Sequence, residues 1–223
     1  MPAREWKAGC LKWEQDVDNP QARQQRERVL KNIATHDCKK SPRAQLVRVW
    51  HKDLFEGLVP HSDYLGNFRN LDKTPWCLEG YDVRVGDTRG APHEHVLKAL
   101  QAYFKEFRSN VKELDQTWQE LGDKYSVDDI DQVVELAARA HGEWVRIHPF
   151  ANGNGRTARL WANYVFCRYG LGPVVIVRPR PNQPYGIFAR QSMKYGNHEP
   201  MKQLFWEMLI NSYQESADVM PLC

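Results

Sequence analysis

The sequence predicts a mainly α-helical single domain with one small β-hairpin. Several segments of the 223-residue chain repeat apolar side chains every three or four residues, which is helical spacing. One short stretch near residue 80 instead alternates apolar and polar side chains, which is typical of a hairpin. The chain shows no internal repeat or low-complexity linker, and its length suits one sizeable core.

The first predicted helices lie at residues 20–35 and 43–56. Both segments contain helix-forming residues, and the second places large apolar side chains on one face: Leu46, Val49, Trp50, Leu54 and Phe55. We therefore expect two N-terminal helices that pack on the rest of the domain.

The predicted hairpin lies in WCLEGYDVRVGD, which begins at Trp76. Apolar and polar residues alternate there around a Glu79-Gly80 turn. After Pro92 the stretch EHVLKALQAYFKEF returns to helical spacing, which predicts another helix.

Two central helices follow. Ser126 is a candidate N-cap with Asp129 three residues on, and Pro149 ends the helix that it opens. The apolar stripe of this helix is expected to contain Ile130, Val134, Ala137, Ala138, His141, Val145 and His148. A second amphipathic helix is predicted from about Gly155, with Gly170 as its C-cap.

The loop between these helices holds two Asn-Gly pairs and two arginines. Asn-Gly is a strong hairpin signal, but the flanks have helical spacing, so a helix-loop-helix corner fits better. Gly153 and Gly155 let consecutive N–H groups point into one concavity at a helix start, which favours an anion. Arg156 and Arg159 are three residues apart, so both guanidinium groups are expected to clamp phosphate oxygens from one side.

His148 completes this set. An imidazole at the rim of a phosphate site can accept a proton from an incoming hydroxyl, so the ordered residues predict phosphoryl or nucleotidyl transfer. The loop does not match the G-x-x-x-x-G-K-[ST] phosphate loop of common NTPases.

Composition and charge indicate which classes of partner to expect. The net charge is +3 and the pI about 8.5, and the short basic pairs Lys39-Lys40 and Arg178/Arg180 are interpreted as solvated surface, so no nucleic acid is expected. No apolar run predicts a membrane span, and the start lacks the apolar region of a signal peptide. We expect a cytoplasmic protein, or one exported by an unrecognised signal.

The cysteines are odd in number and scattered: Cys10, Cys38, Cys77, Cys167 and Cys223. Their spacing includes no Cys-x-x-Cys pair that would suggest zinc or redox chemistry. They are predicted to be reduced thiols.

The stretch HPFANGNGRTAR resembles the signature His-Pro-Phe-x-(Asp/Glu)-Gly-Asn-Gly-Arg-x-x-Arg of Fic-domain proteins. WHKDLFEGLVP…GNFRN and QPYGIFARQSMK are similar to the upstream and downstream blocks of the same family. The resemblance implies a Fic-type helical bundle with a hairpin flap over residues 45–213. Residues 1–44 would be a helical extension packed on this core, and residues 214–223 a C-terminal tail.

The resemblance implies transfer of AMP from ATP, with Mg²⁺, to a Ser, Thr or Tyr hydroxyl of a target protein. His148 would be the base. Arg156 would hold the outer phosphates, and Arg159 would hold the γ-phosphate. The anion hole would consist of the Gly153, Asn154 and Gly155 backbone and the Asn154 side chain. The hairpin at about residues 71–90 resembles the flap that holds the target segment as an added strand.

One position departs from the signature. Asn152 stands where Fic enzymes usually have an acidic metal ligand, and its carbonyl can bind Mg²⁺ but lacks the negative charge. We expect slower turnover or a raised Mg²⁺ requirement. The alternatives are a nucleotide- or phosphate-binding module without turnover, and transfer of UMP or GMP.

No (Ser/Thr)-x-x-x-Glu-(Gly/Asn) inhibitory motif is recognisable. In the nearest candidate, Ser109 and Glu113 are followed by Leu114. Restraint would then come from a partner protein or from an unrelated segment, and the toxin of a bacterial toxin–antitoxin pair fits this pattern.

Four further residues have two interpretations each. His141 is expected to be a core histidine rather than a metal ligand. Trp144 and Trp161 are expected to be core, with adenine stacking as the alternative. Tyr185 either borders the nucleotide or packs in the core.

Overall fold

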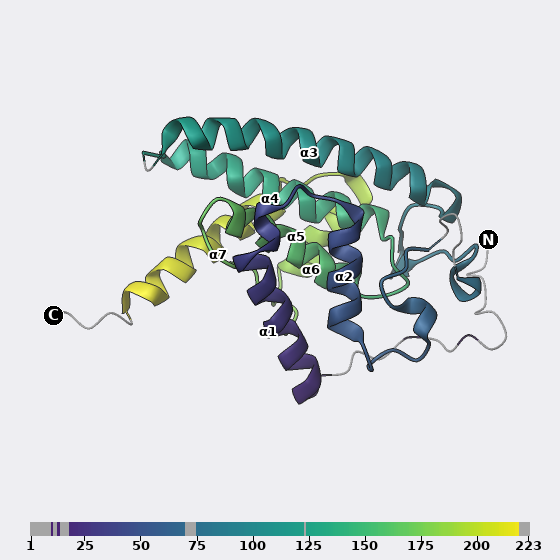
Figure 1. The fold of residues 1–223 in the computed structure, drawn as a ribbon. Helices are drawn as coiled ribbons and strands as arrows, with labels where there is room; N and C mark the ends of the chain where they lie inside the picture. Colours follow the sequence, from purple (N-terminus) through teal and green to yellow (C-terminus); the bar gives the residue numbers. More distant parts are fainter. Residues whose placement is uncertain (1–9, 11–12, 14–17, 70–74, 123, 219–223) are drawn as a thin grey trace.

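The fold is a bundle of helices with one short hairpin. The computed structural model describes Cys10, Trp13 and residues 18–69, 75–122 and 124–218. Its helices and strands are α1 (Pro20–Thr35), α2 (Ala44–Phe55), β1 (Arg84–Val85), β2 (Thr88–Arg89), α3 (Val96–Leu121), α4 (Val127–Ile147), α5 (Asn154–Arg168), α6 (Tyr185–Tyr195) and α7 (Glu199–Asp218) (Figure 1). The mainly helical fold with one hairpin is as predicted.

α4 and α5 form the centre of the bundle. α3, α6 and α7 pack against α4, while α1 and α2 pack against α5 (Figure 1). Trp144 of α4 and Trp161 of α5 are fully buried, and their ring centroids are 6.1 Å apart. Both tryptophans are therefore core residues, as expected, and neither can stack on an adenine.

The predicted start of α4 is correct, whereas its end differs from the prediction. Ser126 and Asp129 form a reciprocal capping box at the N-terminus. His148 was expected on the helical stripe, but it lies one residue beyond the helix with φ 50° and ψ 59°. Pro149 disfavours the right-handed helical region at the residue before it, which explains why the helix ends here.

The hairpin lies a few residues later than predicted. The turn falls at Gly86-Asp87, with Arg84 paired to Arg89, while the expected turn residues Glu79-Gly80 follow a short 3₁₀ helix at Trp76–Leu78. Alternation spans this whole stretch, so it did not determine which turn would be used. Residues 70–74, where the predicted flap begins, lie outside the described residues.

The thiol prediction is wrong for two cysteines. Cys10 and Cys77 form a disulfide although they are 67 residues apart in the sequence, whereas Cys38 and Cys167 are free. The pairing depends on the long-range approach of Cys10 to the loop before α3, which sequence spacing does not encode.

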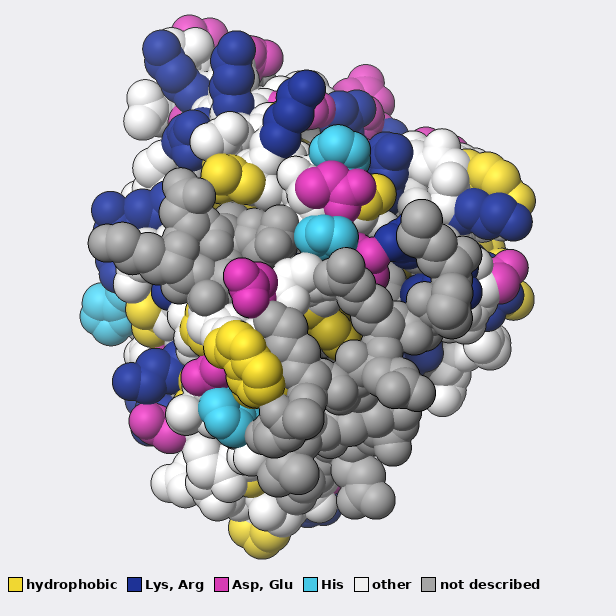
Figure 2. All heavy atoms as spheres, turned by 90° about the vertical axis from the view of Figure 1, so that its right-hand side faces the viewer, with side chains coloured by type: hydrophobic (Ala, Val, Ile, Leu, Met, Phe, Trp, Pro, Cys, Tyr) yellow, Lys and Arg dark blue, Asp and Glu magenta, His cyan; other side chains and the backbone are white. Residues whose placement is uncertain are grey.

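The remaining features concern the chain ends and the surface. α7 continues to Asp218, so the segment predicted as a tail begins within a helix. Among the described residues, no helix combines the length and apolarity needed to cross a bilayer. Basic and acidic side chains are interspersed on the face shown in Figure 2.

Candidate active site

A cavity of about 520 Å³ opens where the α4–α5 loop meets the hairpin and α6. Its described lining contains no Asp or Glu. Six arginines line it: Arg84, Arg156, Arg159, Arg178, Arg180 and Arg190. Such a lining favours an anionic ligand with several negative charges. All seven residues predicted for the site, from His148 to Arg159, line this one cavity.

His148 stands at the floor of the cavity with a defined tautomer. Its Nδ1 lies 2.5 Å from the carbonyl oxygen of Val145, so Nδ1 donates a proton and Nε2 keeps the lone pair. Burial lowers the pKa of His148 to about 4, against a smaller opposing effect of the Val145 hydrogen bond. The ring is therefore neutral at pH 7 and can accept a proton at Nε2.

Arg69 holds the backbone on which His148 sits. This guanidinium is fully buried and donates to the carbonyl oxygens of His148 (2.7 Å) and Ile147 (2.9 Å). It also donates to Tyr81 (3.2 Å) and Ala91 (2.5 Å), which lie on either side of the hairpin. Burial lowers its pKa only to about 10, so it stays charged and offsets the partial negative charge at the C-terminus of α4.

The loop after His148 is closed by its own side chains. Asn154 is buried and its amide forms two hydrogen bonds with the Phe150 backbone, at 2.9 and 2.8 Å. This amide braces the loop, whereas the sequence analysis assigned it to the anion hole. Gly153 caps α5 with φ 79°, and the first N–H groups of α5 have no partner within the helix. These N–H groups suit an anion.

His51 of α2 contacts the backbone of the same loop. Its Nε2 lies 3.1 Å from the Asn152 carbonyl oxygen, and its Nδ1 accepts from the Gly66 N–H at 3.1 Å. Burial lowers its pKa to about 3, so it stays neutral. The ring also stacks on Phe150 at 3.9 Å between centroids.

Asn152 uses both ends of its amide within the protein. Oδ1 accepts a hydrogen bond from the Gly153 N–H at 2.6 Å, and Nδ2 donates to the Trp13 carbonyl oxygen at 2.9 Å. An aspartate could not make the second bond. The asparagine thus connects the loop to Trp13.

The two arginines predicted to clamp phosphate from one side contact different elements. Arg159 is buried and donates to Val177 O (2.9 and 3.2 Å) and to Tyr185 Oη (2.9 Å). Arg156 lies over the Phe55 ring at 4.1 Å. Both arginines line the cavity, but each is held by a different part of the fold.

Tyr185 is a core residue that also lines the cavity, and its contact with a nucleotide stays a prediction. It is buried, lines the cavity, and its hydroxyl lies 2.8 Å from Nε2 of His141. His141 is fully buried in the core, as expected. Arg178 and Arg180, interpreted from sequence as ordinary surface, line the cavity instead.

Two supporting residues, Arg69 and His51, were not singled out from the sequence. Both lie within the upstream block WHKDLFEGLVP…GNFRN, so the block marked their neighbourhood without assigning them a role.

Residues 42–166 match the model of the Fic/DOC family, which is more than half of the chain. The chain belongs to the Fic/DOC family. A protein adenylyltransferase Fic of Nematostella vectensis is 37% identical over 92 residues, which are 40% of this chain and 21% of that protein. One of Drosophila yakuba is 48% identical over 52 residues, 23% of this chain and 10% of that protein. The chain thus matches about a fifth of the first of these relatives and a tenth of the second.

Solved structures share the Fic fold at low identity. A Fic domain containing signaling protein from Bacteroides thetaiotaomicron has a TM-score of 0.63 at 19% identity, covering 89% of this chain and 73% of that one. BepC from Bartonella tribocorum, solved with bound AMPPNP, has a TM-score of 0.53 at 18% identity, covering 93% and 92%. The family match ends at residue 166, so the predicted domain limits at 45 and 213 stay predictions.

Proposed function

We propose that this chain is a protein adenylyltransferase that moves AMP from ATP onto a hydroxyl side chain of a target protein. The observation that carries the proposal is the neutral His148 ring beside the N-terminus of α5 in an arginine-lined cavity. The relatives named as adenylyltransferases and the AMPPNP-bound neighbour support the same reaction.

In the proposed reaction, Nε2 of His148 takes the proton of the target hydroxyl as its oxygen attacks the α-phosphorus. The bond to the leaving pyrophosphate then breaks. The Val145 carbonyl fixes the ring through Nδ1 and stabilises the imidazolium that forms. Arg69 keeps this segment of backbone in place.

The phosphates have two kinds of donor available. The N–H groups of the α5 start provide an anion hole, with Gly153 and Gly155 supplying the close approach. Arg156 is proposed to hold the outer phosphates and Arg159 the γ-phosphate. Arg159 already uses three of its nitrogen atoms, but its terminal nitrogens each keep one N–H.

The hairpin is proposed to hold the target. Arg84, Val85 and Thr88 line the cavity, so an extended segment added to the hairpin edge would bring its hydroxyl towards His148. No inhibitory motif is recognisable in the sequence, so the same proposal includes inhibition of the transfer reaction by a separate antitoxin. The chain would then act as a toxin in the cytoplasm.

The residues present do not fit a Mg²⁺ ion held by the protein. The described cavity lining has no carboxylate, and the Oδ1 of Asn152 already accepts a hydrogen bond from Gly153. Mg²⁺ is usually bound through one or two carboxylates as well as substrate phosphates. Charge on the phosphates is therefore assigned to the arginines, and no step of the proposed reaction passes through the metal.

This same feature favours a second candidate, a nucleotide-binding module without turnover. It keeps the arginines and the helix start but lacks metal chemistry. The identity of the nucleotide base is a separate question. Cζ of Arg180 lies 5.6 Å from the centroid of the Tyr185 ring, but neither side chain distinguishes adenine from uracil or guanine.

The decisive experiment uses wild type and His148→Ala with α-³²P-labelled ATP, UTP and GTP in a bacterial lysate. We expect labelled protein bands from ATP with wild type, and at least about a hundredfold less label with His148→Ala. Nucleotide binding should persist in His148→Ala, measured by calorimetry. Binding without label in wild type would replace the enzyme by the module, and label from UTP or GTP alone would change the nucleotide.

A further inference from the structure

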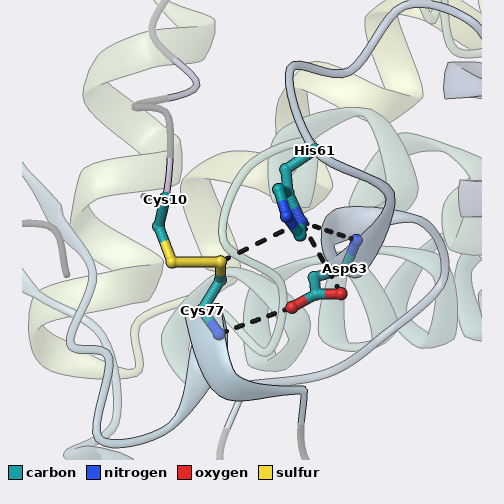
Figure 3. Close-up of a disulfide and its surroundings, with 4 residues drawn as sticks. All are labelled: Cys10, His61, Asp63 and Cys77. Carbon is teal, nitrogen blue, oxygen red and sulfur yellow. Dashed lines mark hydrogen bonds and ion pairs between the residues drawn. A yellow bond between two sulfur atoms is a disulfide. The ribbon is translucent and has the colours of Figure 1, made fainter. Parts of the chain in front are cut away.

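A second cluster of metal-binding side chains lies away from the cavity, around the disulfide. Figure 3 shows His61 and Asp63 pointing towards Cys77, which is bonded to Cys10. Nδ1 of His61 lies 3.9 Å from Sγ of Cys77 and 3.6 Å from Oδ1 of Asp63. The three ligand atoms lie within 4.8 Å of one another.

The two separations measured from His61 are close to the edges of a tetrahedral zinc site. Zinc binds thiolate, imidazole and carboxylate atoms at about 2.0–2.3 Å, so neighbouring ligand atoms of a tetrahedron lie about 3.3–3.8 Å apart. Two sulfurs, one nitrogen and one oxygen are also a ligand set that zinc favours over Ca²⁺ or Mg²⁺. The bonded sulfurs alone are too close together for this geometry.

The ligand atoms already lie next to one another. Nδ1 of His61 accepts a hydrogen bond from the Asp63 N–H at 3.2 Å, so this nitrogen carries the lone pair of the ring, and a zinc ion would bind it in place of that N–H. The Cys77 N–H lies 3.5 Å from Oδ2 of Asp63, which leaves Oδ1 facing His61. The cysteines are buried, while the side chains of His61 and Asp63 are 36% and 26% exposed, so an ion could enter from the solvent side.

We propose that Cys10, His61, Asp63 and Cys77 bind one Zn²⁺ when the disulfide is reduced. A dithiol or phosphine reductant supplies two electrons to the disulfide, and two protons convert the sulfurs to thiols. Zn²⁺ then displaces both thiol protons and binds two thiolates, the neutral imidazole and the carboxylate, with no change in its own oxidation state. The Cα atoms of the cysteines are 5.6 Å apart, so side-chain rotation can separate the sulfurs.

The consequence reaches the cavity through the N-terminal segment. Trp13, three residues after Cys10, lines the cavity and accepts the hydrogen bond from Asn152. Either the disulfide or the zinc ion would tether this segment beside Tyr64 and Phe55, on which Trp13 packs at 6.0 and 4.9 Å. Only the reduced, metal-free chain would release Cys10.

The test measures metal content and does not depend on the proposed transfer reaction. Wild-type protein is reduced with a phosphine, freed of metal by a chelator, incubated with Zn²⁺ alone and desalted without oxygen. We expect one zinc per chain by atomic emission, none in the disulfide form, and none in Cys10→Ser/Cys77→Ser. The matched control Cys38→Ser/Cys167→Ser removes the two cysteines that are free among the described residues and should keep one zinc.

Two further variants keep the test decisive if the Cys10→Ser/Cys77→Ser protein does not fold. His61→Ala and Asp63→Asn change partly exposed side chains and should each weaken zinc binding at least tenfold in competition with a chromogenic chelator. Co²⁺ in reduced wild type should give the absorption bands of a tetrahedral thiolate site. A folded, reduced wild type that retains no zinc, or retention that survives loss of both cysteines, would overturn the proposal.

Discussion

The α4–α5 corner and the connection between α2 and α3 border the same cavity but are built in different ways. The corner consists of two helix ends and a short loop whose side chains bond to neighbours in the sequence, as Asn154 does to Phe150. The connection has two-residue strands and short 3₁₀ helices, and its described part is held mainly by distant contacts through Arg69, Asp82 and the Cys10–Cys77 disulfide.

The difference shows where reactive and supporting groups reside in this fold. The corner presents His148 and the N–H groups that are proposed to bind an anion, and local backbone rules fix their placement. The connection contributes one buried charge, Arg69, which binds the backbone carbonyl groups at the end of α4. Four predictions test this division, from the largest expected effect to the smallest.

Arg69→Met should cause the largest loss of stability. The variant removes the guanidinium donor from the buried carbonyl oxygens of Ile147 and His148 and from the partly buried one of Ala91, which should lower the free energy of unfolding by at least about 3 kcal/mol. Urea unfolding at pH 7 measures it. The control Arg89→Met removes an exposed arginine paired with Asp82, so its cost should stay within about 1 kcal/mol. Equal losses in both variants would refute the special role of Arg69.

Gly153→Ala should disturb the corner itself. A Cβ there would lie 2.6 Å from Cε2 of Phe55 and 3.1 Å from Nε2 of His51, at φ +79°. Gly170 has nearly the same φ, +78°, but nothing within 4 Å of an added Cβ. Both alanine variants incur the backbone strain, and only Gly153→Ala adds a clash. We expect its loss of unfolding free energy to exceed that of Gly170→Ala by about 1–3 kcal/mol.

The sequence predicted the corner far better than the connection. Helix spacing, the Ser126 cap and the signature placed His148 and Arg159 in one site because these signals act over a few residues. Local alternation could not decide between the turns at Gly80 and Gly86, because both are compatible with the same pattern. The role of Arg69 could not be predicted, since its partners are carbonyl groups up to 79 residues away that any sequence provides.

The pH dependence of His148 should show how deeply the corner is buried. Its folded pKa is about 4, below the ordinary histidine value of about 6.5. Between these values the unfolded chain takes up a proton that the folded chain refuses, so stability falls as the pH drops from 6.5 towards 4. By pH 5 this amounts to up to about 2 kcal/mol. NMR should show a His148 ring unprotonated at pH 5, and His148→Gln should lose less stability between pH 7 and 5. A midpoint near 6.5 would mean an exposed ring.

Asn152→Asp links the corner to the N-terminal segment and should have the smallest effect on stability. The carboxylate cannot donate to the Trp13 carbonyl oxygen, so we expect a loss of about 1 kcal/mol in unfolding free energy. Asn152→Ser loses the same bond because its side chain is too short to reach Trp13, so it is the matched control for that loss.

Activity should move the other way in Asn152→Asp alone, because an acidic side chain supplies the Mg²⁺ ligand that the wild-type lining lacks. Labelling with ATP over a Mg²⁺ titration should give a severalfold higher rate, and half of the maximal rate at a lower Mg²⁺ concentration, than in wild type. If Asn152→Asp and Asn152→Ser labelled equally, the charge at this position would have no part in the reaction. The asparagine would then be explained by its bond to Trp13 alone, which makes position 152 an anchor for the N-terminal segment.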